Sequence, residues 1–337
     1  MHGLNIRGRH LLLLTLPLVA LAVLAASPQL LRGTLADGLE GVMLASPTWL
    51  WISGACFVAA LACSGLGWRA GLRLCGGETS GADACSRFGV GCLVNTALPM
   101  NVGSAVRVAL FSRVLHSDGR VWTTGGIATA IGAARGLTMA ALIAIAAVGG
   151  VVPAWPVAAL ALLIGAAIAV SYVTRGSHPG TRIGHVLDAF RILGVEPRKG
   201  LPIVGWAVLG TVARLAAAAA LVTAFGVPGA IGAAFLIVPA LDVAGILPIT
   251  PGNVGMVTAA VAFALNAHGV DGGLALSAGL AFHAVETAAS LLFGAGSLLY
   301  FARLPVGFRR WAIPATAALA AVAVGGAFGL TVLAPLI

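Results

Sequence analysis

The sequence predicts an all-α, polytopic integral membrane protein in which a single transmembrane domain, residues 1–337, contains two inverted repeats. Of the 337 residues, 60% are hydrophobic and 9% are charged, and the mean hydropathy is +1.04. A soluble globular domain carries about 25% charged residues, so that class is excluded. The formal net charge of +9 comes mostly from Lys and Arg in short segments between apolar runs. Such placement orients membrane spans and contacts anionic lipid, so we expect no nucleic-acid partner.

Two similar interruptions of apolar sequence predict the inverted repeats. Leu247–Gly255 contains two prolines and two glycines, and Leu98–Gly103 repeats its Leu-Pro and Asn-Val-Gly elements. Proline removes a backbone donor and breaks a helix, and a broken helix at membrane depth is tolerated only where it is buried in protein or lines a cavity. Paired breaks in the two halves of a membrane protein therefore point to a substrate site between inverted repeats.

The first elements of the chain are an apolar segment and a span. Leu11–Ala26 follows a short basic stretch and is interpreted as a retained span with a cytoplasmic N-terminus, with a cleaved signal peptide as the alternative. Residues 27–48 are expected to form an outer loop. Trp49–Trp68 is the next span, flanked by aromatic residues, and it begins the first repeat, residues 49–173.

The rest of the first repeat consists of a hairpin and two spans. Residues 88–114 are apolar but broken at Pro99–Gly103, and arginines precede and follow them, which predicts a re-entrant hairpin that enters from the inside. Residues 121–150 then cross outward, and residues 152–173 return.

A hydrophilic segment separates the two repeats. Within it, apolar side chains at helical spacing over residues 181–194 predict an amphipathic helix on the inner leaflet, with a solvated linker as the alternative.

The second repeat, residues 201–301, begins with a span at 201–225. An apolar segment then breaks at 248–252, which predicts a hairpin entering from outside or a pair of crossings. A span at 273–301 ends the repeat, and residues 311–336 form the last span.

Together these elements give about six full spans and two hairpins of opposite entry. In this topology Arg32 is outside, Arg135 and Arg214 lie within the bilayer, and all other Lys and Arg residues are inside. This asymmetry supports the assignment, and we place the protein in a bacterial cytoplasmic membrane.

Five charged side chains fall inside the predicted spans and hairpins, where each costs about 2.5–3.5 kcal/mol and needs a partner or a purpose. They are Arg107, Arg135, Arg214, Asp242 and Glu286. One interpretation is that Arg135–Glu286 and Arg214–Asp242 are structural ion pairs. The other is that the three arginines line a polar cavity that binds phosphate, because the guanidinium fork makes bidentate hydrogen bonds to phosphate oxygens.

Neutral polar residues beside the two breaks would complete such a site. They are Asn95, Asn101, Thr250 and Asn253. Asp242, His283 and Glu286 are candidates for proton coupling or for ion pairs with the arginines. We expect no catalytic residues, no metal and no cofactor, because no third ligand accompanies His283 and Glu286. The five cysteines are interpreted as small packing residues.

The residues around the two breaks resemble patterns of the lysylphosphatidylglycerol synthase transmembrane-region family. One segment is similar to the family's N-x-x-x-P-x-x-x-G-E-x-x-R, another to its L-P-x-T-P-G-G-x-G-x-x-E, and Arg135 falls where the family has E-R-x-x-D. The matching residues are Asn95, Pro99, Gly103 and Arg107, then Leu247, Pro248, Thr250, Pro251, Gly252 and Gly255. The family's acidic positions are neutral here and one motif glycine is replaced, as seen at Ser104, Ala134, Thr138, Thr258 and Asn253.

The resemblance implies a flippase-like lipid translocator. Members include the flippase half of the bacterial multiple peptide resistance factors, which move aminoacylated phosphatidylglycerol across the cytoplasmic membrane. Their soluble synthase half has no counterpart in this sequence, so we expect no synthase activity. Because the neutral positions leave a more positive cavity, the expected substrate is an anionic phospholipid or a lipid-linked glycan.

Two other functions and one assembly remain open from the sequence. The first function is a membrane-embedded transferase or hydrolase that acts on lipid-linked substrates. The second is a non-transporting subunit of a lipid-modifying system. Small-residue seams such as Gly294-Ala-Gly296 are compatible with a homodimer.

Overall fold

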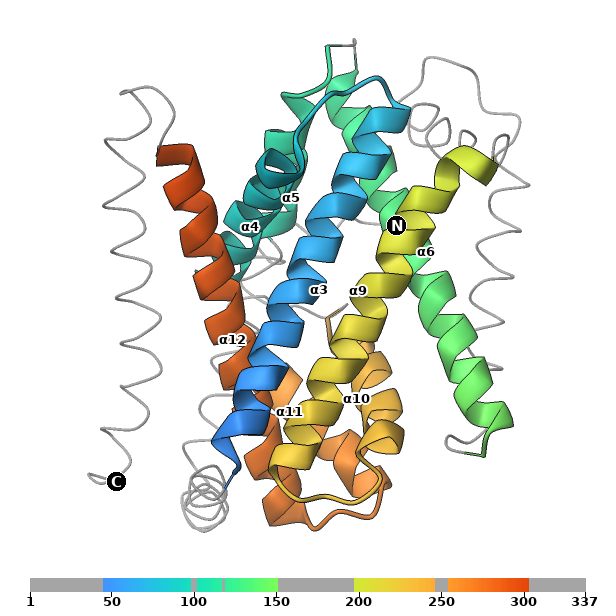
Figure 1. The fold of residues 1–337 in the computed structure, drawn as a ribbon, viewed down its shortest axis with the longest axis vertical. Helices are drawn as coiled ribbons and strands as arrows, with labels where there is room; N and C mark the ends of the chain where they lie inside the picture. Colours follow the sequence, from blue (N-terminus) through green and yellow to red (C-terminus); the bar gives the residue numbers. More distant parts are fainter. Residues whose placement is uncertain (1–44, 98–101, 117–118, 151–196, 246–253, 303–337) are drawn as a thin grey trace, which may run out of the picture.

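The computed structural model describes residues 45–97, 102–116, 119–150, 197–245 and 254–302, and all regular secondary structure within them is α-helical (Figure 1). The predicted all-α class is confirmed for these residues. Several predicted elements lie outside them, namely the spans at 11–26, 152–173 and 311–336 and the amphipathic helix at 181–194.

Four of the described helices are long and apolar enough to cross a membrane, which needs about 20 residues. They are α3 (Pro47–Leu74), α6 (Arg120–Val148), α9 (Pro197–Ala224) and α12 (Gly272–Ala302). Each matches a predicted span. The expected end of the first of these at Trp68 is wrong, because Arg69 and Arg73 belong to the last turns of α3. Arginine side chains there can extend toward the membrane surface.

The first predicted hairpin appears as two short helices, α4 (Gly81–Ala97) and α5 (Val102–Ser112). The predicted start of this hairpin at residue 88 is too late, because α4 begins at Gly81 and includes Arg87. Within α4, Nε of Arg87 lies 2.7 Å from Oδ2 of Asp83, and Nη1 donates a 2.6 Å hydrogen bond to the carbonyl of Leu110. Arg87 therefore stabilises α4 and satisfies a carbonyl near the end of α5.

The second predicted hairpin also appears as two short helices, α10 (Ala230–Ala244) and α11 (Val254–Ala267). Gly229 enters α10 with a φ of +69°, a conformation that favours glycine. After α11, Oδ2 of Asp271 accepts a 3.0 Å hydrogen bond from the N–H of Gly273 and caps the first turn of α12.

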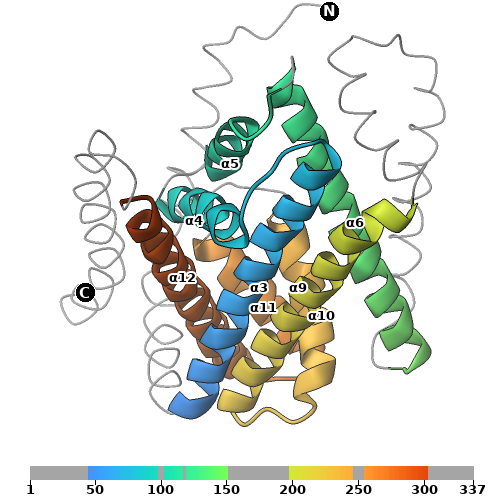
Figure 2. The ribbon, with the colours of Figure 1, turned by 45° about the horizontal axis from the view of Figure 1, so that its top comes forward.

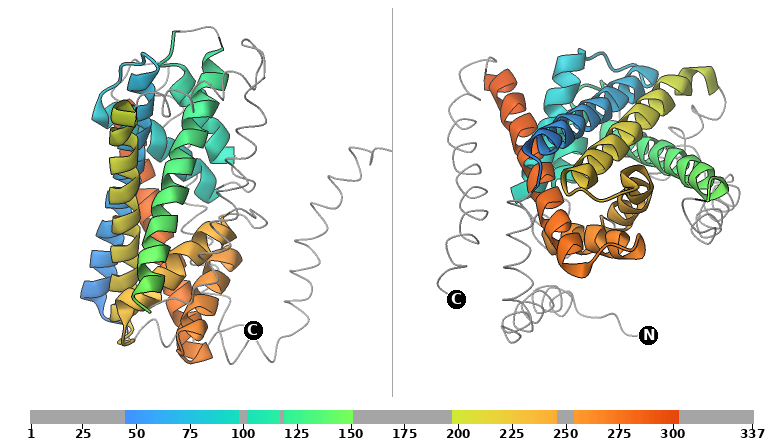
Figure 3. Two further views of the ribbon diagram at one scale, coloured as in Figure 1. Left: turned by 90° about the vertical axis from the view of Figure 1, so that its right-hand side faces the viewer. Right: turned by 60° about the horizontal axis from the view of Figure 1, so that its bottom comes forward.

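The eight described helices form two sequential sets, α3–α6 and α9–α12, which pack against each other. Helices α3 and α9 lie side by side and antiparallel, and the N–H of Ser46 before α3 donates a 2.9 Å hydrogen bond to the carbonyl of Ala224 at the end of α9. The hairpin α4–α5 lies toward one end of the bundle and α10–α11 toward the other (Figures 1 and 2). The side and end views of Figure 3 show the same separation.

The contacts between helices keep the same pattern when the two sets are exchanged. Helix α4 packs on α3, α5 and α12, and α10 correspondingly packs on α9, α11 and α6. In the same way, the contact of α5 with α6 corresponds to that of α11 with α12. The contact of α3 with α12 corresponds to that of α9 with α6. Replacing α3, α4, α5 and α6 by α9, α10, α11 and α12, and vice versa, therefore reproduces the packing pattern of the described helices.

Small residues let the helices approach closely where they cross. The hydroxyl of Ser53 on α3 donates a buried 2.9 Å hydrogen bond to the carbonyl of Ala217 on α9. A Cβ added to Gly294 of α12 would lie 2.7 Å from Cβ of Leu93 and 3.1 Å from the carbonyl oxygen of Gly89, both on α4. Close contact of this kind drives helix association in a membrane. Gly294 belongs to a small-residue seam that is compatible with a homodimer. In the structure it packs against α4 of the same chain.

Positive charge gathers at one end of the bundle. Arg69 and Arg73 at the end of α3 lie at this cationic end, as do Arg113 and Arg120 around the start of α6. At the opposite end, the turns that join α9 to α10 and α11 to α12 carry no Lys or Arg. The described helices therefore have the charge asymmetry that orients membrane proteins.

The largest apolar core fills the half of the bundle away from the cationic end. It joins α3, α6, α9, α10, α11 and α12, and it includes Phe57 and Phe282, whose rings meet edge to face at a centroid distance of 5.1 Å. A smaller core near the cationic end contains Trp68 stacked on Phe111 at 4.5 Å. The larger of these two apolar cores therefore lies away from the cationic end.

Candidate functional site

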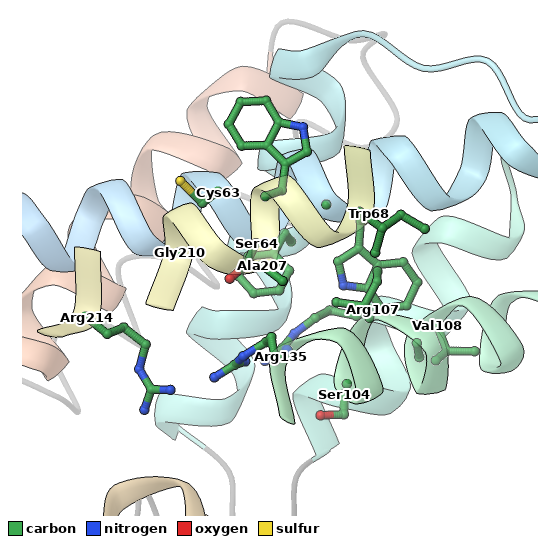
Figure 4. Close-up of a pocket in the computed structure, with 17 residues that line it drawn as sticks. Cys63, Ser64, Trp68, Ser104, Arg107, Val108, Arg135, Ala207, Gly210 and Arg214 are labelled. Atoms are coloured by element: carbon green, nitrogen blue, oxygen red, sulfur yellow. The ribbon is translucent and has the colours of Figure 1, made fainter. Parts of the chain in front are cut away.

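A cavity of about 220 Å³ lies between α3, α4, α5, α6 and α9, and we call it the central cavity. The three arginines predicted to share a cavity all line it, and Figure 4 shows them reaching into it from three different helices. Other residues on its wall are two serines and three aromatic residues, namely Ser64, Ser104, Trp68, Phe88 and Trp206. The wall is therefore largely apolar with a few convergent polar groups, which is typical of a ligand pocket.

Arg107 reaches the central cavity from α5 and is held against α4. Its Cζ lies 4.6 Å from the centroid of the Phe88 ring, a cation–π contact. A Cβ at Gly91 would collide with the Arg107 side chain, so glycine at this position leaves room for it. Nε of Arg107 is buried without a hydrogen-bond partner among the described residues. A buried donor without an acceptor is costly, so this atom marks a place where a ligand oxygen would be stabilised.

Asn95 closes the hairpin that carries Arg107. Its Oδ1 accepts a 2.8 Å hydrogen bond from the N–H of Gly103, across the break between α4 and α5. A Cβ at Gly103 would overlap the Asn95 side chain and the carbonyl of Gly91. The contact satisfies an N–H at the start of α5 that has no partner within its own helix. Asn95 was predicted to bind substrate, but it is not on the wall of the central cavity and its described contact is structural.

Asp242 of α10 contacts the other two arginines. Its Oδ1 lies 2.6 Å from Nη1 of Arg214 and 3.5 Å from Nη2 of Arg135. The predicted Arg214–Asp242 pair is present, whereas Arg135 pairs with Asp242 instead of Glu286. The reason is helix packing: α6 lies against α9 and α10, while α12 lies mainly against α3, α4 and α11. The Arg135 side chain is 42% exposed and that of Arg214 only 18%, so Arg135 is the more accessible of the two.

Glu286 lies on α12 close enough to Arg214 and Asp242 to interact electrostatically with both. Cys92 of α4, which interacts in the same way with Arg107 and Glu286, lies near both. The arginine cluster with its two carboxylates therefore has an excess of positive charge when all five groups are ionised.

His283 does not pair with Glu286 in the structure, although both are on α12. Its Nε2 lies 3.3 Å from Oγ1 of Thr287. Its Nδ1 is buried without a hydrogen-bond partner among the described residues. The predicted protonatable pair is thus not formed by a direct contact.

The remaining predicted site residues, Asn101, Thr250 and Asn253, lie outside the described residues. The structure instead adds residues that the sequence did not single out, above all Phe88 and Gly91. Together with Asn95 they occupy positions i, i+3 and i+7 of α4, which is the spacing of one helix face. This periodicity was the signal that could have identified them.

Comparison with known protein families matches residues 11–294 to the lysylphosphatidylglycerol synthase transmembrane region. The matched segment contains both breaks and all five charged residues of the cluster. A search of curated proteins found no relative of this chain.

Proposed function

The chain belongs to the lysylphosphatidylglycerol synthase transmembrane-region family, and on that premise we propose that it is a flippase-like lipid translocator. The phosphate-bearing headgroup of an anionic phospholipid or lipid-linked glycan enters the central cavity while its acyl chains stay in the bilayer. We propose a bacterial cytoplasmic membrane as the location, with the cationic end and the N-terminus in the cytoplasm, following the charge asymmetry.

The observation that carries this proposal is the unequal number of guanidinium and carboxylate groups at the central cavity. Asp242 is the carboxylate that contacts both Arg135 and Arg214, and Nε of Arg107 is buried with no acceptor among the described residues. Positive charges in a low-dielectric interior require counter-charges. A phosphate supplies both the negative charge and the acceptor oxygens, and arginine binds it with two parallel hydrogen bonds.

The size of the central cavity fits a headgroup better than a whole lipid. Its volume of about 220 Å³ is below the 300–1,000 Å³ usual for drug-sized ligands. A phospholipid with two acyl chains is larger than a drug-sized ligand, so it cannot fit into the central cavity as a whole. The chains therefore have to remain outside the protein, which is the condition for moving a headgroup through a polar route.

The packing pattern of the two helix sets supports alternating access. The exchange of α3–α6 with α9–α12 relates helices of opposite direction, as in the antiparallel pair α3 and α9. Inverted repeats of this kind commonly carry transport by rocking one repeat against the other around a site between them. We infer that α4–α5 and α10–α11 are the broken-helix hairpins of the two repeats.

Catalysis is the less favoured reading. An enzyme acting on lipid-linked substrates would need a general base, and the candidates are Asp242, Glu286 and His283. Asp242 is held by two arginines, and Nε2 of His283 contacts Thr287. These contacts favour anion binding over proton transfer, so we expect no enzymatic activity.

The test is transfer of a fluorescent phosphatidylglycerol between leaflets of vesicles that contain the purified chain. Arg107→Gln should lower the transfer rate by about tenfold or more, because it removes a charged ligand of the phosphate. Arg107→Lys should restore only part of the rate, since it keeps the charge without the fork. Arg113→Gln is the control, because Arg113 is exposed and lines no described cavity. Full activity of Arg107→Gln would refute the assignment.

A further inference from the structure

A second cavity, of about 260 Å³, lies between the last turns of α3 and the first turns of α9, at the cationic end. We call it the interfacial cavity. One part of its wall is cationic, from Arg69 and Arg73, and the other is apolar, from Leu66, Leu74, Pro202 and Trp206. No acidic residue is among the described residues that line it. This combination fits a ligand with an anionic group beside an apolar one.

The two arginines are placed to act together. They are four residues apart on α3, so their Cβ atoms lie on the same face about 5–6 Å apart. Nε of Arg69 donates a 3.0 Å hydrogen bond to the carbonyl of Thr79, which fixes the guanidinium and leaves its terminal nitrogens for a ligand. Arg73 is exposed and makes no ion pair with any described residue.

The position of the interfacial cavity selects the ligand. It lies at the end of α3, a helix long and apolar enough to cross a membrane, and arginine side chains near such an end extend toward the lipid headgroups. Basic residues near an anionic leaflet attract its lipids. A free phosphate ion would make no use of the leucines, proline and tryptophan that form the other part of the wall.

One residue connects the two cavities. Trp206 lines both the interfacial and the central cavity. It packs next to Gly67 of α3, where an added Cβ would lie 3.7 Å from Cβ of Trp206. Trp206 is therefore the described residue that the walls of the two cavities share.

We propose that the interfacial cavity binds the phosphodiester headgroup of an anionic phospholipid from the adjacent leaflet and delivers it past Trp206 to the central cavity. The binding step stands alone, whereas the delivery step rests on the proposed function. Arg69 and Arg73 hold the phosphate, and the apolar wall contacts the glycerol and the upper acyl chain.

Binding is tested with the purified full chain in detergent, titrated with phosphatidylglycerol and examined by native mass spectrometry. The double variant Arg69→Gln/Arg73→Gln should weaken the tightest lipid binding by about fivefold for each arginine removed. Arg73→Gln alone should weaken it about fivefold, and this exposed position keeps the test valid if the double variant misfolds. Arg113→Gln is the matched control and should bind as the native chain does. Equal binding by all variants would overturn the proposal.

Two further arms separate the alternatives. Glycerol 3-phosphate added to the titration should not displace the lipid; complete displacement at equal concentration would assign the cavity to a soluble phosphate. In vesicles, Arg69→Gln/Arg73→Gln should raise the phosphatidylglycerol fraction needed for half-maximal transfer without changing the maximal rate. Unchanged transfer at every lipid fraction would refute the claim that lipid reaches the central cavity through the interfacial cavity. Absence of transfer by the native chain, with lipid binding still lost in the variant, would refute the transport function but retain the binding site.

Discussion

Oδ1 of Asp242 lies 2.6 Å from Nη1 of Arg214, and this contact joins a helix of the hairpin α10–α11 to a residue that lines the central cavity. Asp242 belongs to α10 and Arg214 to α9. The same oxygen also reaches Arg135 of α6 at 3.5 Å. Three helices therefore meet at one carboxylate, and a change in the position of α10 has to change the environment of two of the cavity's arginines.

Asp242→Asn should destabilise the protein, because it leaves two guanidinium groups without their carboxylate. Breaking a fully buried pair costs about 3–5 kcal/mol, and the 37% exposure of Asp242 reduces our expectation to about 2 kcal/mol. Thermal unfolding in detergent measures the loss. Asp242→Asn/Arg214→Gln should lose less than the sum of the single variants, since the pair is coupled. Additive losses would show that the contact contributes no stability.

Gly91→Ala should impair lipid transfer by displacing Arg107. The added methyl group collides with the Arg107 side chain, and misplacing a binding group by about 1 Å can cost up to about 100-fold in rate. Gly136→Ala is the matched control, because an added Cβ at Gly136 meets nothing within 4 Å. Both variants gain the same helix propensity, so propensity cannot explain a difference between them, and thermal unfolding of both measures any loss of stability caused by the clash. Equal transfer rates would mean that Arg107 tolerates the displacement.

Asn95→Ala should loosen the hairpin α4–α5 by about 1 kcal/mol, the usual contribution of a hydrogen bond to an unpaired helix N–H. Asn95→Gln keeps a neutral amide acceptor and should retain part of that stability. Thermal unfolding of the two variants, compared with the native chain, tests the contact. If both variants unfold alike, the acceptor oxygen is not what holds Gly103.

Gly294→Ala should weaken the crossing of α12 with α4, because its Cβ would lie 2.7 Å from Cβ of Leu93. Overpacking at such a contact costs about 1–3 kcal/mol. Gly296→Ala, two residues along the same helix, should be neutral or slightly stabilising, since nothing lies within 4 Å of its added Cβ. Thermal unfolding of the pair measures the difference. A larger loss in Gly296→Ala would contradict the described packing.

The helices and their breaks could be predicted from sequence because each depends on local physics. Apolar length marks α3, α6, α9 and α12, and proline with glycine marks the interruptions after Ala97 and Ala244. The start of α4 was missed for a local reason too. Asp83 and Arg87 make its first turns polar, so they resembled a loop, whereas they form an ion pair at i and i+4.

The site could be predicted only in part. Arg107, Arg135 and Arg214 were identified because charge inside an apolar segment is costly wherever the helices lie. The partner of Arg135 could not be identified in the same way, because it depends on which helix packs against α6. Sequence position suggested Glu286 as that partner, and the packing of α10 against α6 gives Asp242 instead.

The edge-to-face rings of Phe57 and Phe282 bring α3 and α12 together in the largest apolar core, away from the cationic end. In the proposed transport, a headgroup that moves from the central cavity toward that end would meet the apolar core to which these two rings belong. Tethering the two positions covalently would therefore arrest the cycle with the headgroup still bound. The energy barrier to release, more than the affinity of the arginines, would then set the turnover of this protein.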